Sequence, residues 1–211
     1  MKKYDIINKV INTGVVSVVR ADDMEKATAI INGCMLGGIN AIEVTFTMDF
    51  ALELLEKYRY TNAVLGAGSV FDSETARLAI LSGAEFIVSP SFDLDTAKLC
   101  NRYHIPYIPG CMTITEVVTA TSIGCDIIKL FPASQMGPGF IKSIKAPLPN
   151  VQIMPTGGVD INNIGDWIKA GSICVGIGGE FTKLADFGKH EEIASVAKAY
   201  VDKVREAKGA L

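Results

Sequence analysis

The stretch CDIIKLFP, residues 125–132, places a lysine in the middle of a short apolar strand. Residues 127–131 form an apolar run of strand length, which the following proline stops. Because side chains alternate along a strand, Ile127, Lys129 and Phe131 share one face. A buried ammonium is costly unless it is paired, and an amine that sheds its proton there can attack a carbonyl. On this strand alone, an edge-strand or ion-paired lysine and a nucleophile explain the pattern equally well.

The composition is that of an ordinary globular protein. The 211 residues are 49% hydrophobic and 20% charged, with no linker or low-complexity tract, so one domain spanning residues 1–211 is expected. The net charge of −3 gives neither a basic footprint for nucleic acid nor a polybasic patch for a membrane. No apolar run is long enough to span a bilayer, and no signal peptide is evident. Five cysteines without a CxxC pair are typical of reduced thiols in a cytoplasmic protein.

Short apolar runs alternate with amphipathic segments from end to end. Eight runs are expected as strands, at residues 15–19, 41–45, 63–66, 86–89, 107–109, 127–131, 151–154 and 173–176. Expected helices include residues 23–36, 73–82, 93–102, 115–122 and 162–170, with two more at about 5–12 and 191–206. Strands that are hydrophobic on both faces favour a parallel sheet covered by helices. The pattern predicts an α/β fold, a (β/α)8 TIM barrel with an extra N-terminal helix. An open doubly wound sheet ranks behind it because no glycine-rich turn follows the first strand.

The second expected strand carries a carboxylate, Glu43, which is expected to point to the same side of the sheet as Lys129. In a barrel, catalytic groups lie at the C-terminal ends of strands and point inward. Glu43, Thr45 and Thr47 share one face, whereas the apolar residues between them suit packing against helices. Glu43 is therefore expected to point into the barrel together with Lys129. Such a pair can be a core ion pair, and it is also what Schiff-base chemistry requires.

Small residues follow the third, seventh and eighth expected strands. The third ends in GAGS, where Ser69 could donate a hydrogen bond to a substrate carboxylate. The segments PTGGVD, residues 155–160, and GIGG, residues 176–179, follow the seventh and eighth. Paired glycine-rich loops at these places in a barrel usually form a phosphate cradle. Glu180 comes directly after the second loop and would repel phosphate if its carboxylate pointed there.

Six motifs, taken in this order, resemble one known family. They are Glu43-Val44-Thr45, Gly66-Ala67-Gly68-Ser69-Val70, Ser89-Pro90, Ile108-Pro109-Gly110, Lys129-Leu130-Phe131-Pro132-Ala133 and Pro155-Thr156-Gly157-Gly158-Val159. The chain resembles the 2-keto-3-deoxy-6-phosphogluconate / 4-hydroxy-2-oxoglutarate aldolases, which are class I, Schiff-base aldolases. The likeness extends from about Val16 to Gly179, nearly the whole expected barrel.

The resemblance implies a role for each group of residues in the expected pocket. Lys129 would form the imine, and Glu43 would transfer protons. Ser69 would contact the keto-acid, and Pro90 and Phe131 would line its pocket. Arg20, Thr45 and Thr47 are further candidates for binding the substrate. The distal phosphate would be bound by the two glycine loops, namely Thr156, Gly157, Gly158, Gly178 and Gly179. Family members are typically cytoplasmic homotrimers of carbohydrate metabolism, so a homotrimer is expected here.

Two positions depart from the family pattern. The best-known members carry an arginine shortly after the Glu-Val-Thr motif, to hold the pyruvyl carboxylate, whereas this chain has Thr47. Loss of a charge-assisted contact typically costs about 1.5–3 kcal/mol unless another donor substitutes. Arg20 is a candidate, although a surface salt bridge with Asp22 or Asp23 would also explain it. Glu180 stands where a small hydroxylic residue is expected beside the phosphate.

The expected activity is that of an aldehyde-lyase acting on 2-keto-4-hydroxy acids. Lys129 would form an imine at C2, and Glu43 would help to break the C3–C4 bond. The products would be pyruvate and glyceraldehyde 3-phosphate or glyoxylate. No metal or cofactor is required, and the only histidines, His104 and His190, lack ligand spacing.

Two other functions compete with this one. A phosphosugar isomerase or epimerase could use the same barrel, with Glu43 as base and Lys129 as an electrostatic stabiliser without a covalent adduct. A catalytically idle metabolite-binding barrel is the third possibility, and it would leave the buried lysine unexplained.

Overall fold

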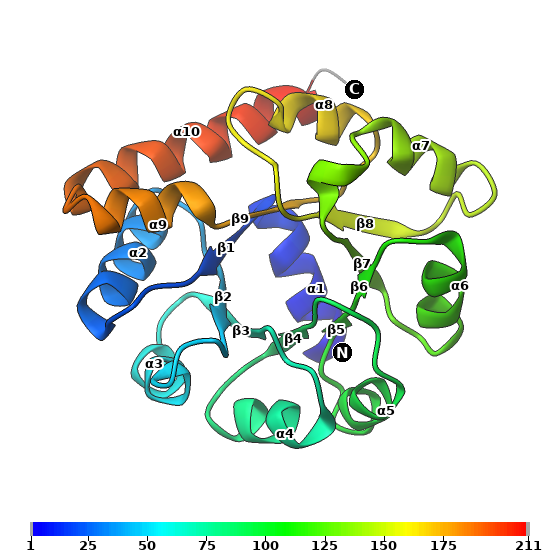
Figure 1. Ribbon diagram of the computed structural model, residues 1–211, viewed down its shortest axis with the longest axis horizontal. Helices are drawn as coiled ribbons and strands as arrows, with labels where there is room; N and C mark the ends of the chain where they lie inside the picture. The colour runs from blue at the N-terminus through cyan, green and yellow to red at the C-terminus, as the bar shows by residue number, and fades with distance from the viewer. Residues whose placement is uncertain (1, 210–211) are drawn as a thin grey trace.

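Parallel strands form two sheets in the computed structural model, which describes residues 2–209 (Figure 1). The strands are β1 (Val15–Val19), β2 (Ala41–Thr45), β3 (Val64–Gly68), β4 (Phe86–Val88), β5 (Tyr107–Ile108), β6 (Gly110–Cys111), β7 (Ile127–Leu130), β8 (Gln152–Pro155) and β9 (Val175–Ile177). One sheet has the order β5-β4-β3-β2-β1-β9 and the other β6-β7-β8. Every pair is parallel, and neighbours follow chain order except where β9 lies beside β1. This order lacks the reversal of a doubly wound sheet.

Helices alternate with the strands, and most of them lie outside the two sheets (Figure 1). They are α1 (Lys2–Thr13), α2 (Met24–Leu36), α3 (Ala51–Tyr58), α4 (Ser73–Leu81), α5 (Leu94–Arg102), α6 (Ile114–Ser122), α7 (Gly139–Lys145), α8 (Ile164–Lys169), α9 (Gly179–Asp186) and α10 (His190–Gly209), with a 3-10 turn at Ala133–Gln135. Asp23, Asp72 and Asp93 each accept a hydrogen bond from the N–H three residues on, which caps α2, α4 and α5. Among the described residues, no helix has the length and apolar character needed to cross a membrane.

The α/β architecture predicted from the sequence is confirmed, but the strands are divided differently. The predicted fifth strand, residues 107–109, is two short strands, β5 and β6, which flank Pro109. Proline has no N–H to donate to a ladder, although the Pro109 carbonyl accepts from the Lys129 N–H at 2.9 Å. Because β5 pairs with β4 and β6 pairs with β7, this one segment contributes to both sheets.

The other edges of the two sheets also meet. Thr156, just after β8, forms an isolated parallel bridge with Gly176 of β9. The Ile173 N–H donates to the Ile153 carbonyl at 3.1 Å on the amino side of that bridge. The two sheets are therefore in contact at both of their junctions.

One apolar cluster joins α1 to residues of the strands. The predicted N-terminal helix is present as α1, and its Ile6, Ile7 and Val10 pack against residues such as Ala41 and Val64, which begin β2 and β3. A second, larger cluster lies between the strands and the outer helices. Because α1 covers the amino ends, the polar inward-facing residues gather toward the carboxyl ends.

Candidate active site

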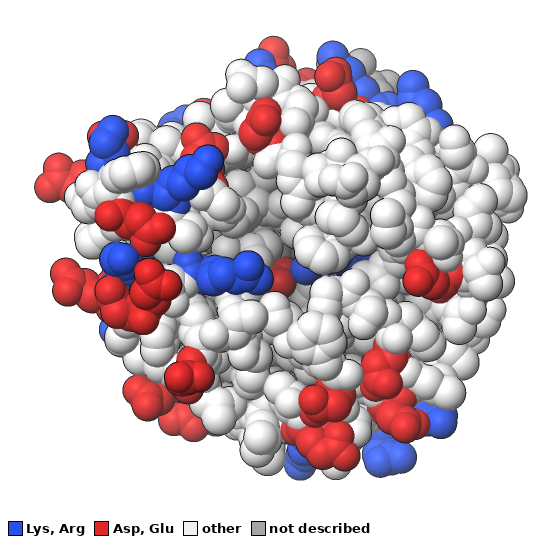
Figure 2. Space-filling model, viewed as in Figure 1, with Lys and Arg blue, Asp and Glu red and all other residues white. Residues whose placement is uncertain are grey.

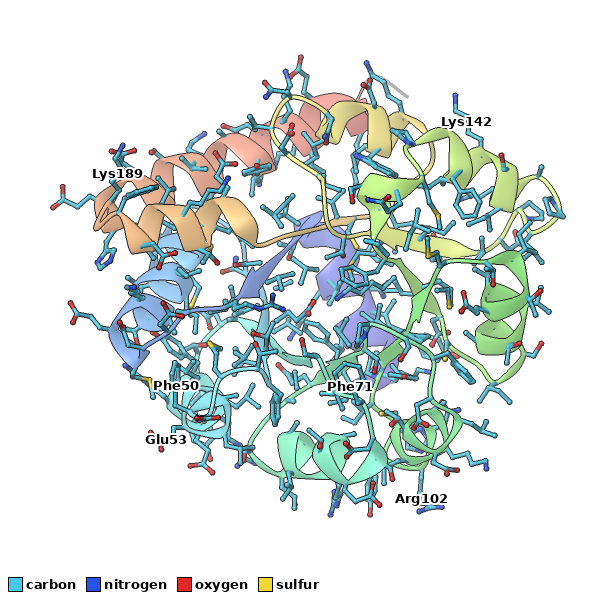
Figure 3. The ribbon with its side chains drawn as sticks, in the orientation of Figure 1. Phe50, Glu53, Phe71, Arg102, Lys142 and Lys189 are labelled. Atoms are coloured by element: carbon cyan, nitrogen blue, oxygen red, sulfur yellow. The ribbon has the colours of Figure 1, made fainter. Side chains whose placement is uncertain are left out.

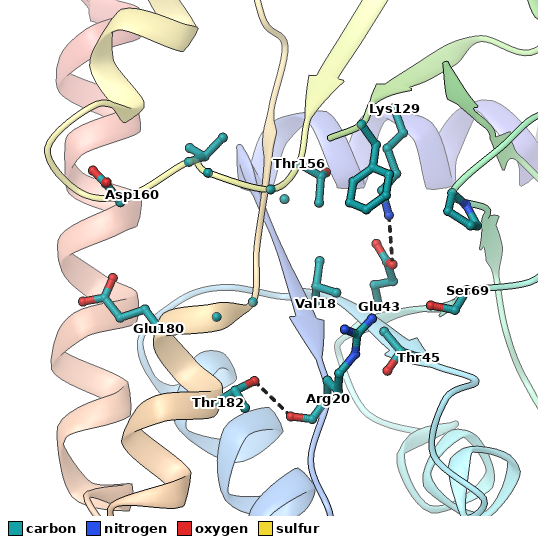
Figure 4. A pocket seen from close by; sticks show the side chains of 18 of the residues that line it. Val18, Arg20, Glu43, Thr45, Ser69, Lys129, Thr156, Asp160, Glu180 and Thr182 are labelled. Carbon is teal, nitrogen blue, oxygen red and sulfur yellow. Dashed lines mark hydrogen bonds and ion pairs between the residues drawn. The ribbon is translucent and has the colours of Figure 1, made fainter. Parts of the chain in front are cut away.

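Lys129 and Glu43 face each other across the interior of the two sheets (Figure 4). Each is the third residue of its strand, Lys129 in β7 and Glu43 in β2. The Nζ atom of Lys129 lies 3.5 Å from Oε1 of Glu43, and the two side chains are only 6% and 1% exposed. The same Nζ lies 5.1 Å from the centre of the Phe131 ring. A primary amine and a carboxylate are thus held together away from bulk water.

One oxygen of the Glu43 carboxylate has no hydrogen-bond partner among the described residues. This atom, Oε2, is buried. A buried polar atom without a partner is costly, and such atoms often belong to catalytic sites. Gly68 of β3 provides the room for the carboxylate, since a Cβ there would lie 2.2 Å from Oε1 of Glu43. The carboxylate can therefore accept a further hydrogen bond from a bound molecule.

Arg20 extends from the end of β1 toward Glu43 (Figure 4). Its carbonyl accepts a hydrogen bond of 3.0 Å from the Thr182 hydroxyl, which ties this loop to α9. Within residues 2–209 the Arg20 guanidinium forms no ion pair, and Asp22 lies 3.8 Å from Lys26 instead. The surface salt bridge considered for Arg20 is therefore absent from the described part of the chain, and its charge faces the pocket.

Hydroxyl groups lie beside the arginine. The Thr45 hydroxyl donates to the Val19 carbonyl at 2.8 Å and lies 3.1 Å from the Thr47 hydroxyl. Ser69 follows β3 with φ of +58°, in the left-handed region that non-glycine residues rarely adopt. Its hydroxyl points toward the space between Glu43 and Arg20 (Figure 4). The carboxyl ends of β1, β2 and β3 therefore offer one guanidinium and several hydroxyls to a ligand.

The glycine loops after β8 and β9 form the opposite end of the same pocket. Gly157 and Gly158 have φ of +85° and +84°, which glycine adopts without strain. At Gly178 a Cβ would lie 2.8 Å from the Val18 carbonyl oxygen, so the backbone approaches β1 closely there. Carboxylates lie at this end as well, from Asp160 after β8 and Glu180 in the first turn of α9 (Figure 4).

One pocket of about 990 Å³ joins both ends. Its opening is the hollow at the centre of Figure 2, where basic and acidic atoms lie inside. Every residue that the sequence assigned to a site lines it, namely Arg20, Glu43, Thr45, Thr47, Ser69, Pro90, Lys129, Phe131, Thr156, Gly157, Gly158, Gly178 and Gly179. The structure therefore brings all of these residues together, although their roles remain predictions.

The arrangement agrees with what comparisons with known proteins find. The family model described as KDPG and KHG aldolase matches residues 6–199. The chain belongs to the KDPG and KHG aldolase family. It is therefore an enzyme of the aldolase class, where KDPG stands for 2-keto-3-deoxy-6-phosphogluconate and KHG for 4-hydroxy-2-oxoglutarate.

Individual relatives support the assignment to this family. The 2-dehydro-3-deoxy-phosphogluconate aldolase of Treponema pallidum is 33% identical over 157 residues, which cover 73% of this chain and 75% of that protein. The KDPG aldolase of Zymomonas mobilis with 3-phosphoglycerate superimposes with a TM-score of 0.84 at 28% identity, covering 94% and 96% of the two chains. KDPG aldolase of Legionella pneumophila, solved with pyruvate captured as a covalent carbinolamine, gives 0.82 at 26% identity, covering 90% and 96%.

The sequence motifs predicted no role for several residues that line the aldolase pocket. They are Val18, Phe71, Val159, Asp160, Ile161, Asn162, Gly176, Thr182, Lys183 and Tyr200. Asp160 belongs to the PTGGVD motif and could have been included on that ground. Tyr200 lies on α10, outside every motif, and its hydroxyl donates to the Glu180 carboxylate. No local pattern of the sequence indicates this contact.

The aldolase offers neither a metal centre nor a reactive thiol among its described residues. No group of three His, Cys, Asp or Glu residues there is arranged to hold a metal ion. The five cysteines are buried and unpaired, and burial raises the pKa of each thiol to about 12. At neutral pH these thiols stay protonated and act as small apolar side chains.

Proposed function

We propose that this aldolase cleaves 2-keto-4-hydroxy acids to pyruvate and an aldehyde through a Schiff base on Lys129. The observation that supports this most is the buried Lys129 amine, 3.5 Å from the Glu43 carboxylate on a facing strand. The substrates proposed from the family are KDPG and 4-hydroxy-2-oxoglutarate, with glyceraldehyde 3-phosphate or glyoxylate as the second product. The chemistry at C2 to C4 is the same for both.

The reaction begins when the neutral Lys129 amine adds to the C2 ketone. Loss of water from the carbinolamine gives a protonated imine, which is an electron sink. Glu43 then removes the C4 hydroxyl proton, directly or through a water, and the C3–C4 electron pair moves into the imine to give an enamine. The aldehyde leaves, Glu43 returns the proton to C3, and hydrolysis of the imine releases pyruvate and the amine. General acid–base help of this kind contributes roughly 10²–10⁴-fold.

The keto-acid carboxylate is proposed to bind at the ends of β1, β2 and β3. Arg20 would supply the charge that the family's arginine supplies elsewhere, since its guanidinium faces the pocket. Ser69 and Thr47 would add hydroxyl donors, while Pro90 and Phe131 would pack against the methyl end of pyruvate. The glycine loops would hold the tail of the substrate.

Reductive trapping tests the proposal. Treatment with pyruvate and borohydride should add an irreversible mass increment that maps to Lys129. The Lys129→Met variant should lose both the adduct and turnover while keeping its fold, as judged by circular dichroism. Lys142→Met is the matched control, because Lys142 is exposed on α7 and points outward (Figure 3). Active protein that forms no adduct would instead indicate an isomerase or epimerase that works without a covalent intermediate.

We also propose that the two sheets close into a single (β/α)8 barrel domain. The Thr156–Gly176 bridge supports closure at one junction, and the shared segment around Pro109 supports it at the other. In this description β5 and β6 are one interrupted strand. The barrel would place the pocket at the carboxyl ends of the strands, the usual place for catalysis in this fold.

The proposed assembly is a cytoplasmic homotrimer. The helices α4, α5 and α6 follow one another around the molecule (Figure 1). Apolar side chains are exposed on or beside them, namely Leu78, Leu81, Leu94, Tyr103, Met112, Ile114 and Val118. Exposed apolar patches of this kind mark protein interfaces. Sedimentation equilibrium should give three times the chain mass of 22.6 kDa. The five unpaired thiols support a reducing compartment.

A further inference from the structure

We propose that the distal end of the pocket selects substrates with a neutral, hydroxylated tail and disfavours a terminal phosphate, with Glu180 as the specificity-determining residue. The preferred substrate class would be unphosphorylated 2-keto-3-deoxy sugar acids, ahead of the phosphorylated KDPG that the family suggests. This inference rests on the proposed function, because it concerns the tail of the substrate whose ketone reacts with Lys129.

The distal end carries two carboxylates where the glycine loops would otherwise be free to receive an anion. Glu180 is the second residue of α9, directly after Gly179, which begins the helix, and Gly178, which precedes it. Asp160 is in the loop after β8, and both acids line the pocket. Figure 4 shows both acids on the opposite side of the pocket from Lys129. A tail reaching past the glycines therefore meets negative charge.

The Glu180 carboxylate is held in place rather than free to swing out. Tyr200 of α10 is fully buried, and its hydroxyl donates a hydrogen bond to Oε2 of Glu180. Burial first, and then the Glu180 carboxylate, raise the pKa of Tyr200 above its ordinary range, so the phenol stays protonated and remains a donor. Asp160 is also anchored, because its Oδ1 accepts from the N–H groups of Asn162 and Asn163 at 2.8 and 3.1 Å.

Positive charge at the distal end does not neutralise both Asp160 and Glu180. Lys183, one turn along α9 from Glu180, also lines the pocket and is exposed. No ion pair joins it to Asp160 or Glu180 among the described residues. The amino end of α9 would favour an anion, but Glu180 is itself the acidic residue in that first turn and already interacts with it. A phosphate dianion would therefore be placed against a site with excess negative charge, which costs affinity.

The distal end of the pocket is suited to the hydroxyl groups of a substrate tail. A carboxylate is a hydrogen-bond acceptor only, so Glu180 and Asp160 can accept from sugar hydroxyls but not from a fully ionised phosphate. The Asn162 side chain and the main-chain groups of the glycine loops add further polar partners. The chemistry of this end therefore fits a polyol tail.

A pair of substrates that differ only in the phosphate gives the test. The kcat/KM of the full chain should be at least about tenfold higher on 2-keto-3-deoxygluconate than on its 6-phosphate, equivalent to about 1.4 kcal/mol. Glu180→Gln, which removes the charge at constant size, should shift this ratio at least about tenfold toward the phosphate ester, mainly through KM. Glu191→Gln is the matched control, because Glu191 is exposed on α10 outside the pocket, and the ratio should not change.

The outcomes separate this inference from the proposed function. A wild-type preference for the phosphate ester, or a ratio unchanged in Glu180→Gln, would overturn the inference while the pyruvate adduct on Lys129 still supports an imine mechanism. If Lys183→Met abolished a preference for the ester, Lys183 would be a phosphate ligand and the inference would be wrong. No turnover of either substrate, together with no adduct on Lys129, would refute the proposed function and this inference with it.

Discussion

The Glu43→Gln substitution separates proton transfer from imine formation. Glutamine has nearly the same shape as glutamate, so the 3.5 Å approach to Lys129 can persist while the base is lost. The proposed mechanism needs Glu43 for the proton of the C4 hydroxyl. Turnover should therefore fall by roughly 10²–10⁴-fold, which corresponds to about 2.7–5.4 kcal/mol of activation free energy. The borohydride adduct with pyruvate should still form, because the Lys129 amine remains.

The same variant should keep its fold, because glutamine fits the space of Glu43 and its carbonyl oxygen can still accept a hydrogen bond from Nζ of Lys129. A change at one buried hydrogen bond typically costs about 0.5–1.5 kcal/mol. In a chain of this size the melting temperature should then fall by about 3 °C.

The assays are steady-state pyruvate release, mass spectrometry after reduction, and thermal unfolding followed by circular dichroism. Glu53→Gln is the matched control, because Glu53 is exposed on α3 and points outward (Figure 3). Turnover of Glu43→Gln within tenfold of the wild type would refute the role of Glu43.

Three further predictions concern the surroundings of this pair and the buried thiols. Gly68→Ala should fold but lose most turnover, because the new Cβ would lie 2.2 Å from Oε1 of Glu43 and displace the carboxylate. The loss is measured by kcat and by the yield of the borohydride adduct. Arg20→Gln should raise KM for keto-acids by roughly 10- to 150-fold, the equivalent of about 1.5–3 kcal/mol, with a smaller change in kcat. Burial raises the pKa of Cys34 from 9.0 to about 12. Its contribution to stability is therefore complete below pH 9 and lost between pH 9 and 12, and urea unfolding of Cys34→Ala should show a shallower alkaline decline.

The pairing of Glu43 with Lys129 was predictable because strand geometry is local. Alternation places Glu43 on the face opposite its apolar neighbours and Lys129 on the face of Ile127 and Phe131, and the expected barrel makes these the inward faces. The meeting of the two glycine loops was predictable for a similar reason. They follow consecutive parallel strands, whose carboxyl ends lie at the same edge of the sheet. These inferences needed only the alternation of side chains along each strand and the order of the strands in the chain.

Contacts between distant segments were not predictable in the same way. The Thr182 hydroxyl binds the Arg20 carbonyl across 162 positions of the chain, and α9 itself was not among the expected helices. The division of the predicted fifth strand at Pro109 depends on which neighbour each half pairs with. Likewise, the periodicity of α1 predicts a helix but not that it packs at the amino ends of the strands. Each of these features is decided by packing rather than by local pattern.

The residues proposed to react with the substrate and those proposed to contact its tail are held in place by different parts of the structure. Lys129 and Glu43 project from paired strands at the centre of the fold, where any shift would disturb several neighbours. Glu180 and Asp160 instead belong to the start of a helix and a loop, and Glu180 depends on one side chain of α10. Substitutions in the second set can alter which tail is accepted while the amine and its carboxylate keep their geometry. Shared family membership therefore carries more weight for the bond that is broken than for the group at the far end of the substrate.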